Sequence, residues 1–398
     1  MGKPFKDIFI VDFSNVVSGP MAVQMLADQG ADVIKVETPG VGDICRNLGA
    51  RRGGVSSMFA VLNRNKRSIV LDLKQAEARE VALKLTERAD VMIENFRPGA
   101  MARVGLDYES VKQRNPNLVY TSVSGFGQDG PYSSRRVYDP IIQSISGIAD
   151  AQKITGTKEV DLVKNLICDK VTSVTTAQAI SAALYEREKT GAGQHVEVSM
   201  LSAGLAFFWP DGMWNQTLLG DGIQPMPLLS EIYRINKTAD GFVTIITVSD
   251  DEWQGLCRAI NHPEMGTAEE YANLPARLKN IARIIEFLDG EIKKWPTDEL
   301  CERLEAEQVP FAKVNAAPEV ADDPQITHSE LIVKGEHPHG GALQYPVQAA
   351  RFSGERGTTR YEAPMLGEHS EQILAELGFS PENISDYRKR GIIEQFQQ

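Results

Sequence analysis

The chain has 398 residues and a mass of 43.8 kDa, a length that suggests about two or three domains. Its composition, 42% hydrophobic and 24% charged, is that of a globular protein and excludes a disordered or collagen-like chain. The formal net charge of −12 argues against nucleic-acid binding, which needs a concentrated positive surface.

The first 125 residues alternate between strand and helix signals. The predicted strands are Ile8–Phe13, Ala31–Glu37, Ser68–Leu73, Val91–Phe96 and Leu118–Phe126, and the predicted helices are Pro20–Gly30 and Ala76–Ala89. Alternation of this kind predicts a largely parallel sheet with helices on its faces.

A second unit is predicted after a change in composition. A long helix at Val171–Lys189 and a strand at His195–Met200 precede Phe207–Pro227, which is rich in Trp, Pro and Gly and is interpreted as a connector. The elements predicted beyond it are strands at Phe242–Val248 and Val309–Val314 and helices at Asp250–Ile260, Leu278–Lys294, Asp298–Gln308, Glu368–Leu377 and Glu382–Lys389.

Several common site motifs are absent or incomplete. Gly125–Gly130 reads GFGQDG, but Pro131–Arg136 follows as a loop where a dinucleotide site needs a helix. HExxH, GxSxG and GxxxxGK[ST] do not occur, which argues against a zinc peptidase, an α/β-hydrolase and a P-loop enzyme. His337 and His339 are expected to be solvated, and no metal site is predicted.

The cysteines and the hydropathy indicate the cellular compartment. Cys45, Cys168, Cys257 and Cys301 are widely spaced and form no CxxC pair, so neither a zinc site nor a disulfide framework is expected. The N-terminus lacks the pattern of a signal peptide, and no apolar run approaches the roughly 18 residues of a membrane span. We therefore expect a cytoplasmic protein with no membrane partner.

Two basic segments, Arg51–Gly53 and Asn63–Arg67, stand out from the acidic background. Such a local patch favours a small anionic ligand over a polymer.

Asp169 is the most informative single residue. It lies just before the predicted helix Val171–Lys189, where an acid gains from the helix dipole and could serve only as a cap. It could equally be a nucleophile, because carboxylates form covalent acyl intermediates. The residues around it leave both interpretations open.

Six segments in order along the chain resemble the class III CoA-transferases, a family that includes formyl-CoA transferase, carnitine CoA-transferase and the α-methylacyl-CoA racemases. The resemblance covers nearly the whole chain. The segments are Val11–Asp43, Asn63–Lys74, Ala89–Glu109, Asn115–Tyr132, Glu186–Met200 and Ala363–Leu374.

The resemblance implies a set of site residues. The family's catalytic aspartate falls on Asp169. The positions that match its CoA-contacting residues are Val16, Val17, Ser18, Leu71, Asp72, Leu73, Lys74, Asn95, Phe96, Arg97, Arg103, Arg136 and Tyr138. Arg and Lys suit the 3′-phosphate and diphosphate of CoA. Coenzyme A and acyl-CoA are then substrates, and no tightly bound cofactor is expected.

Differences from the family's sequence patterns favour one of the family's activities over the others. Formyl-CoA transferase has an Arg where this chain has Thr38, and a glycine run where this chain has Pro225–Asn236. The racemases place a His where this chain has Tyr138, directly before Asp139. Without that His, α-proton exchange lacks one of its two bases.

We therefore predict CoA transfer from an acyl-CoA to a carboxylic acid through an aspartyl anhydride and an aspartyl-CoA thioester. A racemase or epimerase is the alternative, and a non-catalytic acyl-CoA-binding subunit is a third candidate.

The resemblance also implies the architecture, an α/β fold in which two subunits interlock as a homodimer. Each subunit would have a large Rossmann-like domain and a smaller α/β domain. The predicted divisions are residues 1–206 for the first part of the large domain, 207–227 for a linker, 228–325 for the small domain, and 326–398 for the return linker and the rest of the large domain.

Overall fold

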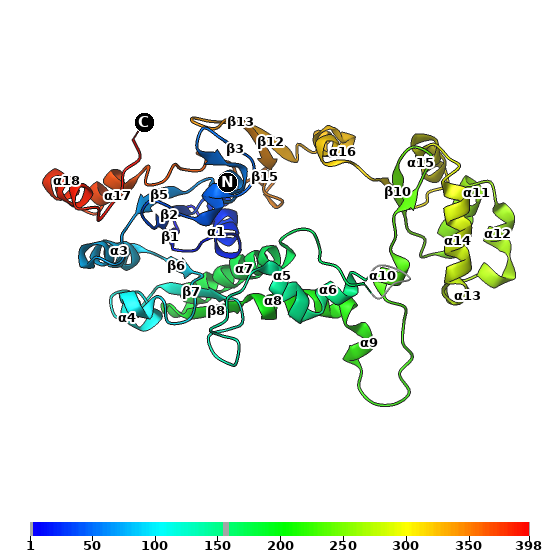
Figure 1. Ribbon diagram of the computed structural model, residues 1–398, viewed down its shortest axis with the longest axis horizontal. Helices are drawn as coiled ribbons and strands as arrows, with labels where there is room; N and C mark the ends of the chain where they lie inside the picture. The colour runs from blue at the N-terminus through cyan, green and yellow to red at the C-terminus, as the bar shows by residue number, and fades with distance from the viewer. Residues whose placement is uncertain (1–2, 154–158, 398) are drawn as a thin grey trace. The chain divides into compact units, whose positions relative to one another are not determined.

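The computed structural model describes residues 3–153 and 159–397 (Figure 1). The chain forms two compact units. The first comprises Met1–Ala149, Leu162–Pro210 and Thr327–Gln398, and thus takes in both ends of the chain. The second comprises Asp211–Ile326 and the described residues of Asp150–Asp161, a segment that the predicted divisions placed in the large domain.

A six-stranded parallel sheet forms the centre of the first unit (Figure 1). Its strands are β1 (Phe9–Asp12), β2 (Asp32–Glu37), β5 (Arg67–Val70), β6 (Val91–Glu94), β7 (Val119–Ser124) and β8 (His195–Ser199). Their order across the sheet is β5-β2-β1-β6-β7-β8. In chain order this is 3-2-1-4-5-6, the order of doubly wound nucleotide-binding folds. The order reverses between β1 and β6, and ligands of such sheets bind beyond the carboxyl ends of the strands at that point.

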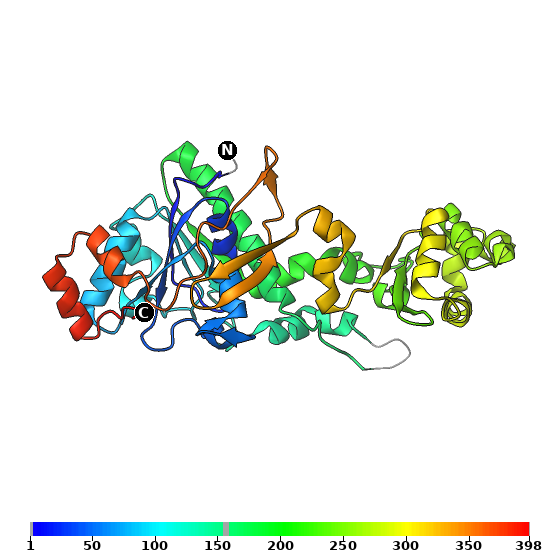
Figure 2. The same ribbon diagram turned by 90° about the horizontal axis from the view of Figure 1, so that it is seen from above.

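Helices cover both faces of the sheet. On one face α1 (Ser18–Asp28) and α7 (Ile167–Thr190) share an apolar core with the strands, to which Ile10, Leu26 and Ile180 belong. On the other face α3 (Ala76–Arg88), α4 (Tyr108–Lys112), α17 (Ser370–Glu376) and α18 (Pro381–Lys389) share a second core. Figure 2 shows the C-terminal helices in red on the α3 side of the sheet. The strand residues that face these two cores are apolar, among them Ile10, Val11, Ile34 and Met92.

The first unit has further short elements. They are β3 (Arg51–Arg52), β4 (Val55–Ser56), α2 (Ser57–Asn63), α5 (Asp139–Ser146), α6 (Ile148–Ala151), α8 (Met200–Gly212), β12 (Ile332–His337), β13 (Gly341–Pro346), β14 (Arg351–Phe352) and β15 (Glu355–Arg356). Among residues 3–153 and 159–397, no helix is long and apolar enough to cross a membrane.

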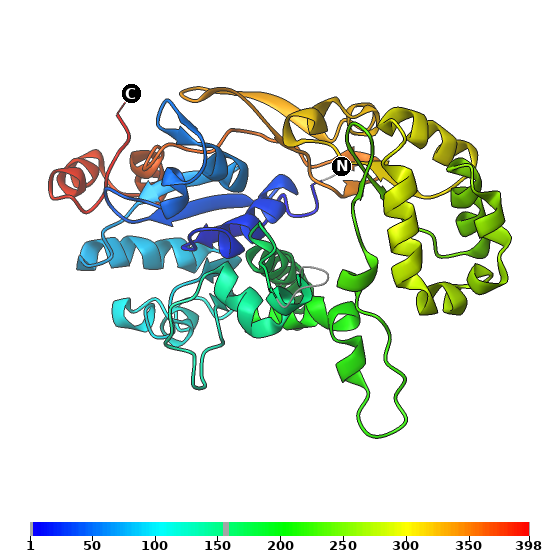
Figure 3. The same cartoon turned by 45° about the vertical axis from the view of Figure 1, so that its right-hand side comes forward.

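The second unit packs helices against a small antiparallel sheet (Figure 3, green to yellow). The strands are β9 (Asn236–Lys237), β10 (Phe242–Ile245) and β11 (Phe311–Lys313), and β10 is central. The helices are α9 (Trp214–Thr217), α10 (Leu229–Ile232), α11 (Asp250–Ala259), α12 (Pro263–Thr267), α13 (Leu274–Lys279), α14 (Ile281–Ile292), α15 (Thr297–Ala306) and α16 (Pro324–His328). Trp253, Leu256 and Leu300 are fully or almost fully buried in its core.

Three elements differ from the sequence-based expectations. The long helix α7 begins at Ile167 and not at Val171, so Asp169 lies inside its first turn. The first residues of the predicted connector Phe207–Pro227 are helical, because α8 runs to Gly212 and includes Pro210. The predicted helix Leu278–Lys294 is divided at Asn280 between α13 and α14.

Candidate active site

Asp169 lies in the first turn of α7, and its side chain does not cap that helix. The N-terminus of α7 begins after Leu166 with no side-chain cap. The backbone N–H and the hydroxyl of Ser18, the first residue of α1, instead stabilise the charged form of the Asp169 carboxylate. Its own backbone N–H donates to Oδ2 of Asp139 at 2.9 Å. The capping interpretation is therefore wrong for its side chain, and Asp139 is the acid that satisfies a free N–H of α7.

The environment of Asp169 makes its carboxyl group a weak acid. Only 8% of the residue is exposed. Burial raises the pKa of Asp169 to about 7, the negative charge of Asp139 adds to the rise, and the hydrogen bonds from Ser18 oppose it. A buried carboxyl group that titrates near neutral pH is a common property of catalytic acids, bases and nucleophiles.

Asp139 is held tightly beside Asp169. It begins α5, is 1% exposed, and its Oδ1 accepts a hydrogen bond from Gln143 Nε2 at 2.5 Å. Two acids are thus fixed near each other at the N-termini of two helices. The favourable helix dipoles partly offset the repulsion between the two carboxylates.

Asn95 lies directly after β6 and forms hydrogen bonds to the loop that leads from β1 into α1. Its Oδ1 accepts the backbone N–H of Asn15 at 2.8 Å, and its Nδ2 donates to the Asn15 carbonyl at 2.7 Å. The same Nδ2 lies 3.4 Å from the hydroxyl oxygen of Ser18. Ser18, Asn95 and Asp169 therefore meet where the strand order reverses, between β1 and β6.

The other predicted CoA-contacting residues also follow the carboxyl ends of strands. Leu71–Lys74 follows β5, Asn95–Arg97 follows β6, and Arg136 and Tyr138 lie in the loop after β7. Leu71 is fully buried, so its side chain is not available to a ligand. Within the described residues, no hydrogen bond or ion pair joins Leu71–Lys74, Arg103, Arg136 or Tyr138 to Asp169.

Four cations of the predicted CoA set are available to an anion. Lys74, Arg97, Arg103 and Arg136 are exposed, and within the described ranges none of them takes part in an ion pair. Free guanidinium and ammonium groups suit the phosphates of CoA.

The basic segment Asn63–Arg67, by contrast, is engaged inside the protein. Arg64 forms an ion pair with the buried Asp28 at 2.6 Å, Lys66 with the buried Asp12 at 2.9 Å, and Arg67 with Asp32 at 2.9 Å. The expectation that this segment forms a ligand-binding patch is wrong, because its charges neutralise buried and half-buried acids. Arg52 likewise donates to the carbonyl groups of Gly340 and Ala342.

The sequence analysis did not identify a network of buried charges next to the loop between β1 and α1. Lys35, in the middle of β2, is fully buried between Asp43 at 3.0 Å and Asp12 at 4.0 Å. Burial alone would lower the pKa of Lys35, but the two aspartates and Glu37 raise it. The available signal was a lysine between Ile34 and Val36, inside a strand of a sheet covered on both faces.

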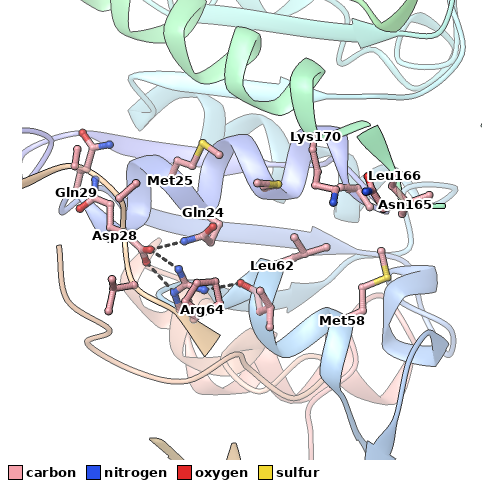
Figure 4. Close-up of a pocket in the computed structure, with 18 residues that line it drawn as sticks. Gln24, Met25, Asp28, Gln29, Met58, Leu62, Arg64, Asn165, Leu166 and Lys170 are labelled. Atoms are coloured by element: carbon pink, nitrogen blue, oxygen red, sulfur yellow. Dashed lines mark hydrogen bonds and ion pairs between the residues drawn. The ribbon is translucent and has the colours of Figure 1, made fainter. Parts of the chain in front are cut away.

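A cavity of about 740 Å³ lies beside these residues. Val17, Met21, Met25, Met58 and Leu62 supply most of its apolar lining. Figure 4 shows Leu166 and Lys170 of the α7 end on one side and the hydrogen-bonded cluster of Gln24, Asp28 and Arg64 on the other. Leu166 and Lys170, which precede and follow Asp169 in the sequence, thus line this largely apolar cavity.

A metal centre has no candidate in the part of the chain that the structure describes, because no three His, Cys, Asp or Glu side chains are grouped to hold an ion.

The sequence model of CoA-transferase family III matches residues 5–370. The chain belongs to CoA-transferase family III. Membership identifies it as an acyl-CoA:carboxylate CoA-transferase by family, and CoA thioesters are the substrates of such enzymes.

Relatives across the whole length agree with this family. A succinate–glutarate CoA-transferase of Agrobacterium fabrum is 35% identical over 94% of this chain and 96% of its own. A formyl-CoA:oxalate CoA-transferase of Streptomyces coelicolor is 32% identical over 98% of this chain and 99% of its own. The crystal structure of a CaiB/BaiF family protein from Brucella suis is 31% identical, with a TM-score of 0.83 over 95% of this chain and 100% of that one.

Proposed function

We propose that this family III enzyme moves CoA from an acyl-CoA to a free carboxylic acid through covalent intermediates on Asp169. The observation that carries the proposal is the arrangement of this carboxylate. It is buried, its pKa is raised to about 7, and the N–H and hydroxyl of Ser18 stabilise its charged form.

The first half of the reaction consumes the donor. The Asp169 carboxylate attacks the thioester carbonyl, the C–S bond breaks, and a mixed anhydride and a CoA thiolate form. The thiolate then attacks the aspartyl carbonyl of the anhydride, and the donor acid leaves as its carboxylate. Asp169 now carries CoA as a thioester. Covalent catalysis of this kind divides one difficult exchange into easier steps.

The second half repeats these steps in reverse with the acceptor. The acceptor carboxylate attacks the aspartyl-CoA thioester and expels the thiolate, and the thiolate attacks the acceptor's acyl carbon in the new anhydride. The new acyl-CoA leaves and the Asp169 carboxylate is regenerated. One thioester forms for each that breaks, so the exchange needs no ATP. Ser18 is placed to donate hydrogen bonds to oxygens of the aspartyl group as its charge changes.

The pH dependence of the reaction follows from the pKa of Asp169. The nucleophile must be ionised, so kcat/KM is expected to rise with pH through a midpoint near 7. Asp139→Asn removes a negative charge that raises this pKa, so the midpoint is expected to move to lower pH. Initial rates across a pH series measure both midpoints.

The control for this experiment is Asp129→Asn, which removes a charge from an exposed loop and should leave the midpoint in place. A midpoint that Asp139→Asn leaves unchanged, or moves to higher pH, would contradict the electrostatic role of Asp139.

We propose that the unpaired cations Lys74, Arg97, Arg103 and Arg136 bind the phosphates of CoA, and that the main chain at Val16–Ser18 and Leu71–Lys74 contributes further contacts. Asp72, Leu73, Asn95, Phe96 and Tyr138 complete the proposed CoA site. Arg97→Ala and Arg136→Ala are each expected to raise the KM for acyl-CoA by about 10-fold or more, since a hydrogen bond to a charged group contributes about 1.5–3 kcal/mol. The change in kcat should be small, because these contacts persist throughout the reaction.

Arg351→Ala is the matched control for the CoA-binding cations. Arg351 is also exposed but lies on β14, outside the proposed site, so the KM of this variant for acyl-CoA should equal that of the unaltered enzyme. Equal effects of all three substitutions would indicate nonspecific electrostatic attraction and not a defined phosphate site.

We propose that the acids exchanged belong to the short-chain carboxylic acids, with dicarboxylic acids first on the panel because of the succinate–glutarate relative. The test incubates the protein with acyl-CoAs and isotope-labelled acids without ATP and identifies the products by mass spectrometry. A labelled acyl-CoA with matching release of the donor acid supports transfer. Deuterium uptake at the α-carbon without acid exchange would favour a racemase, and no reaction across the panel would favour a binding subunit.

We propose that the protein acts as an interlocked homodimer in the cytoplasm. Large apolar side chains are exposed on adjacent elements of the first unit, and a partner subunit would cover them. They are Tyr138, Ile141 and Ile145 at α5, Val174 on α7, and Phe207 and Trp209 on α8. Exposed apolar groups gathered in this way mark protein interfaces.

A further inference from the structure

Val16, in the loop between β1 and α1, has a backbone conformation that valine rarely adopts. Its φ is +67°, in the left-handed region, where a β-branched side chain crowds the backbone. The other described non-glycine residues with positive φ are Asn65, Asn261, Gln308, Glu330 and Ser353, and none of these is β-branched. Strain of this kind persists only where the surroundings enforce it.

The Asp43 carboxylate holds Val16 in this conformation through hydrogen bonds. Its Oδ1 accepts the backbone N–H of Val16 at 3.1 Å and that of Cys45 at 2.9 Å. The Cys45 thiol in turn donates to the Val16 carbonyl at 3.0 Å. Both backbone polar groups of Val16 are therefore fixed by the turn that begins at Asp43.

Asp43 is itself held by a buried cation. The ammonium group of Lys35 lies 3.0 Å from Asp43 Oδ2, and both side chains are fully buried. The same ammonium group donates to the Ser14 carbonyl at 2.6 Å. Lys35 thus ties the start of the loop to the carboxylate that holds Val16.

The conformation of Val16 determines where Ser18 points. Only Val17 separates the two residues, and Asn95 fixes the peptide group on the other side of Val16. Ser173, one turn after Asp169 on α7, donates to the Val17 carbonyl at 3.4 Å, and the adjacent N–H and hydroxyl of Ser18 stabilise the charged form of Asp169. Rotation of Val16 into an ordinary conformation would redirect the chain just before α1 and move these two donors.

We propose that Asp43 is a positioning residue, whose carboxylate holds Val16 in its left-handed conformation and thereby keeps Ser18 aimed at Asp169. This inference rests on the proposed role of Asp169 as the nucleophile. Asp43 contributes no atom to the reaction and acts only through the backbone of Val16.

The test compares Asp43→Ala with Val16→Gly/Asp43→Ala. Asp43→Ala is expected to lower kcat by about 10- to 100-fold, because a displacement of about 1 Å of a reacting group has effects of this size. The KM for acyl-CoA should change less than kcat, since the loop supplies only main-chain contacts to CoA and the four cations proposed to bind its phosphates lie outside it. Glycine adopts positive φ without strain, so the double variant should recover at least about fivefold in kcat.

Ser353→Gly/Asp43→Ala is the matched control. Ser353 also has positive φ, at 51°, but lies in the turn between β14 and β15. Glycine there relieves similar strain without affecting the loop, so this variant should stay as slow as Asp43→Ala. Recovery in the control would show that general stabilisation restores kcat, and would overturn the proposal.

Asp43→Asn replaces Asp43→Ala in all three variants if the alanine protein does not fold. The amide keeps the size of the side chain, but one of its ends must present N–H groups either to Lys35 or to the backbone N–H groups of Val16 and Cys45. The same pattern of loss and glycine rescue is expected, with a loss of at least about threefold.

Two further results would overturn the inference. One is a fall in unfolding temperature with unchanged kcat. The other is a fall in kcat that Val16→Gly does not relieve. Failure of the proposed function is distinguishable from both, because it would appear as turnover that survives the loss of the Asp169 carboxylate.

Discussion

Replacing Asp169 by alanine is expected to reduce CoA transfer by at least about 1,000-fold, since removal of a covalent nucleophile has effects of this size or larger. Asp169→Asn should be similarly inactive, because an amide cannot attack the thioester. The CoA-binding cations are unchanged in both variants, so calorimetric titration with CoA should give dissociation constants close to that of the unaltered enzyme.

Glu188→Gln is the matched control for this prediction. Glu188 is an exposed acid on the same helix, α7, and its neutralisation should leave transfer unchanged. If Asp169→Ala turned over at a rate comparable to Glu188→Gln, Asp169 would not be the nucleophile. If Asp169→Ala lost CoA binding together with transfer, the fold of the site would have failed and not its chemistry.

Asp12→Ala is expected to lower the free energy of unfolding by about 3–5 kcal/mol, because removal of one partner of a buried ion pair leaves the other charge uncompensated. Asp12 and Lys66 are both fully buried and lie 2.9 Å apart. Burial already lowers the pKa of Lys66 to about 8, although Asp12 opposes the shift. Denaturant-induced unfolding, followed by circular dichroism, measures the effect.

Glu80→Ala provides the comparison for Asp12→Ala. Glu80 also pairs with a cation, Arg114 at 3.1 Å, but both side chains are well exposed. Such a pair contributes about 0–1 kcal/mol. Equal losses of stability in the two variants would contradict the view that the buried network holds the loop before α1 in place.

The sheet could be predicted from the sequence, since its strands are short apolar runs separated by helical patterns. Ala31–Glu37 and Val91–Phe96 were placed within one or two residues of β2 and β6. The start of α7 was placed four residues too late. Asn165–Asp169 carries no side-chain cap to mark it, and the N–H of Asp169 is satisfied by Asp139, which lies 30 positions away in sequence.

The site could be predicted only in part. Family resemblance pointed to Asp169, but local sequence could not show that its side chain does not cap α7, because its neighbours Ser18 and Asp139 are distant in sequence. The basic segment Asn63–Arg67 was misread for a similar reason. Lys66 and its partner Asp12 are 54 positions apart, so the pairing became visible only in the fold.

The central claim, covalent catalysis by Asp169, is tested most directly by detection of the intermediate. The enzyme is mixed with an acyl-CoA, quenched in acid during turnover and digested, and the peptides are examined by mass spectrometry. We predict that the peptide containing Asp169 carries CoA through a thioester, and that hydroxylamine converts this thioester to a hydroxamate at the same residue. An unmodified Asp169 during sustained transfer, or modification at a different residue, would contradict the account.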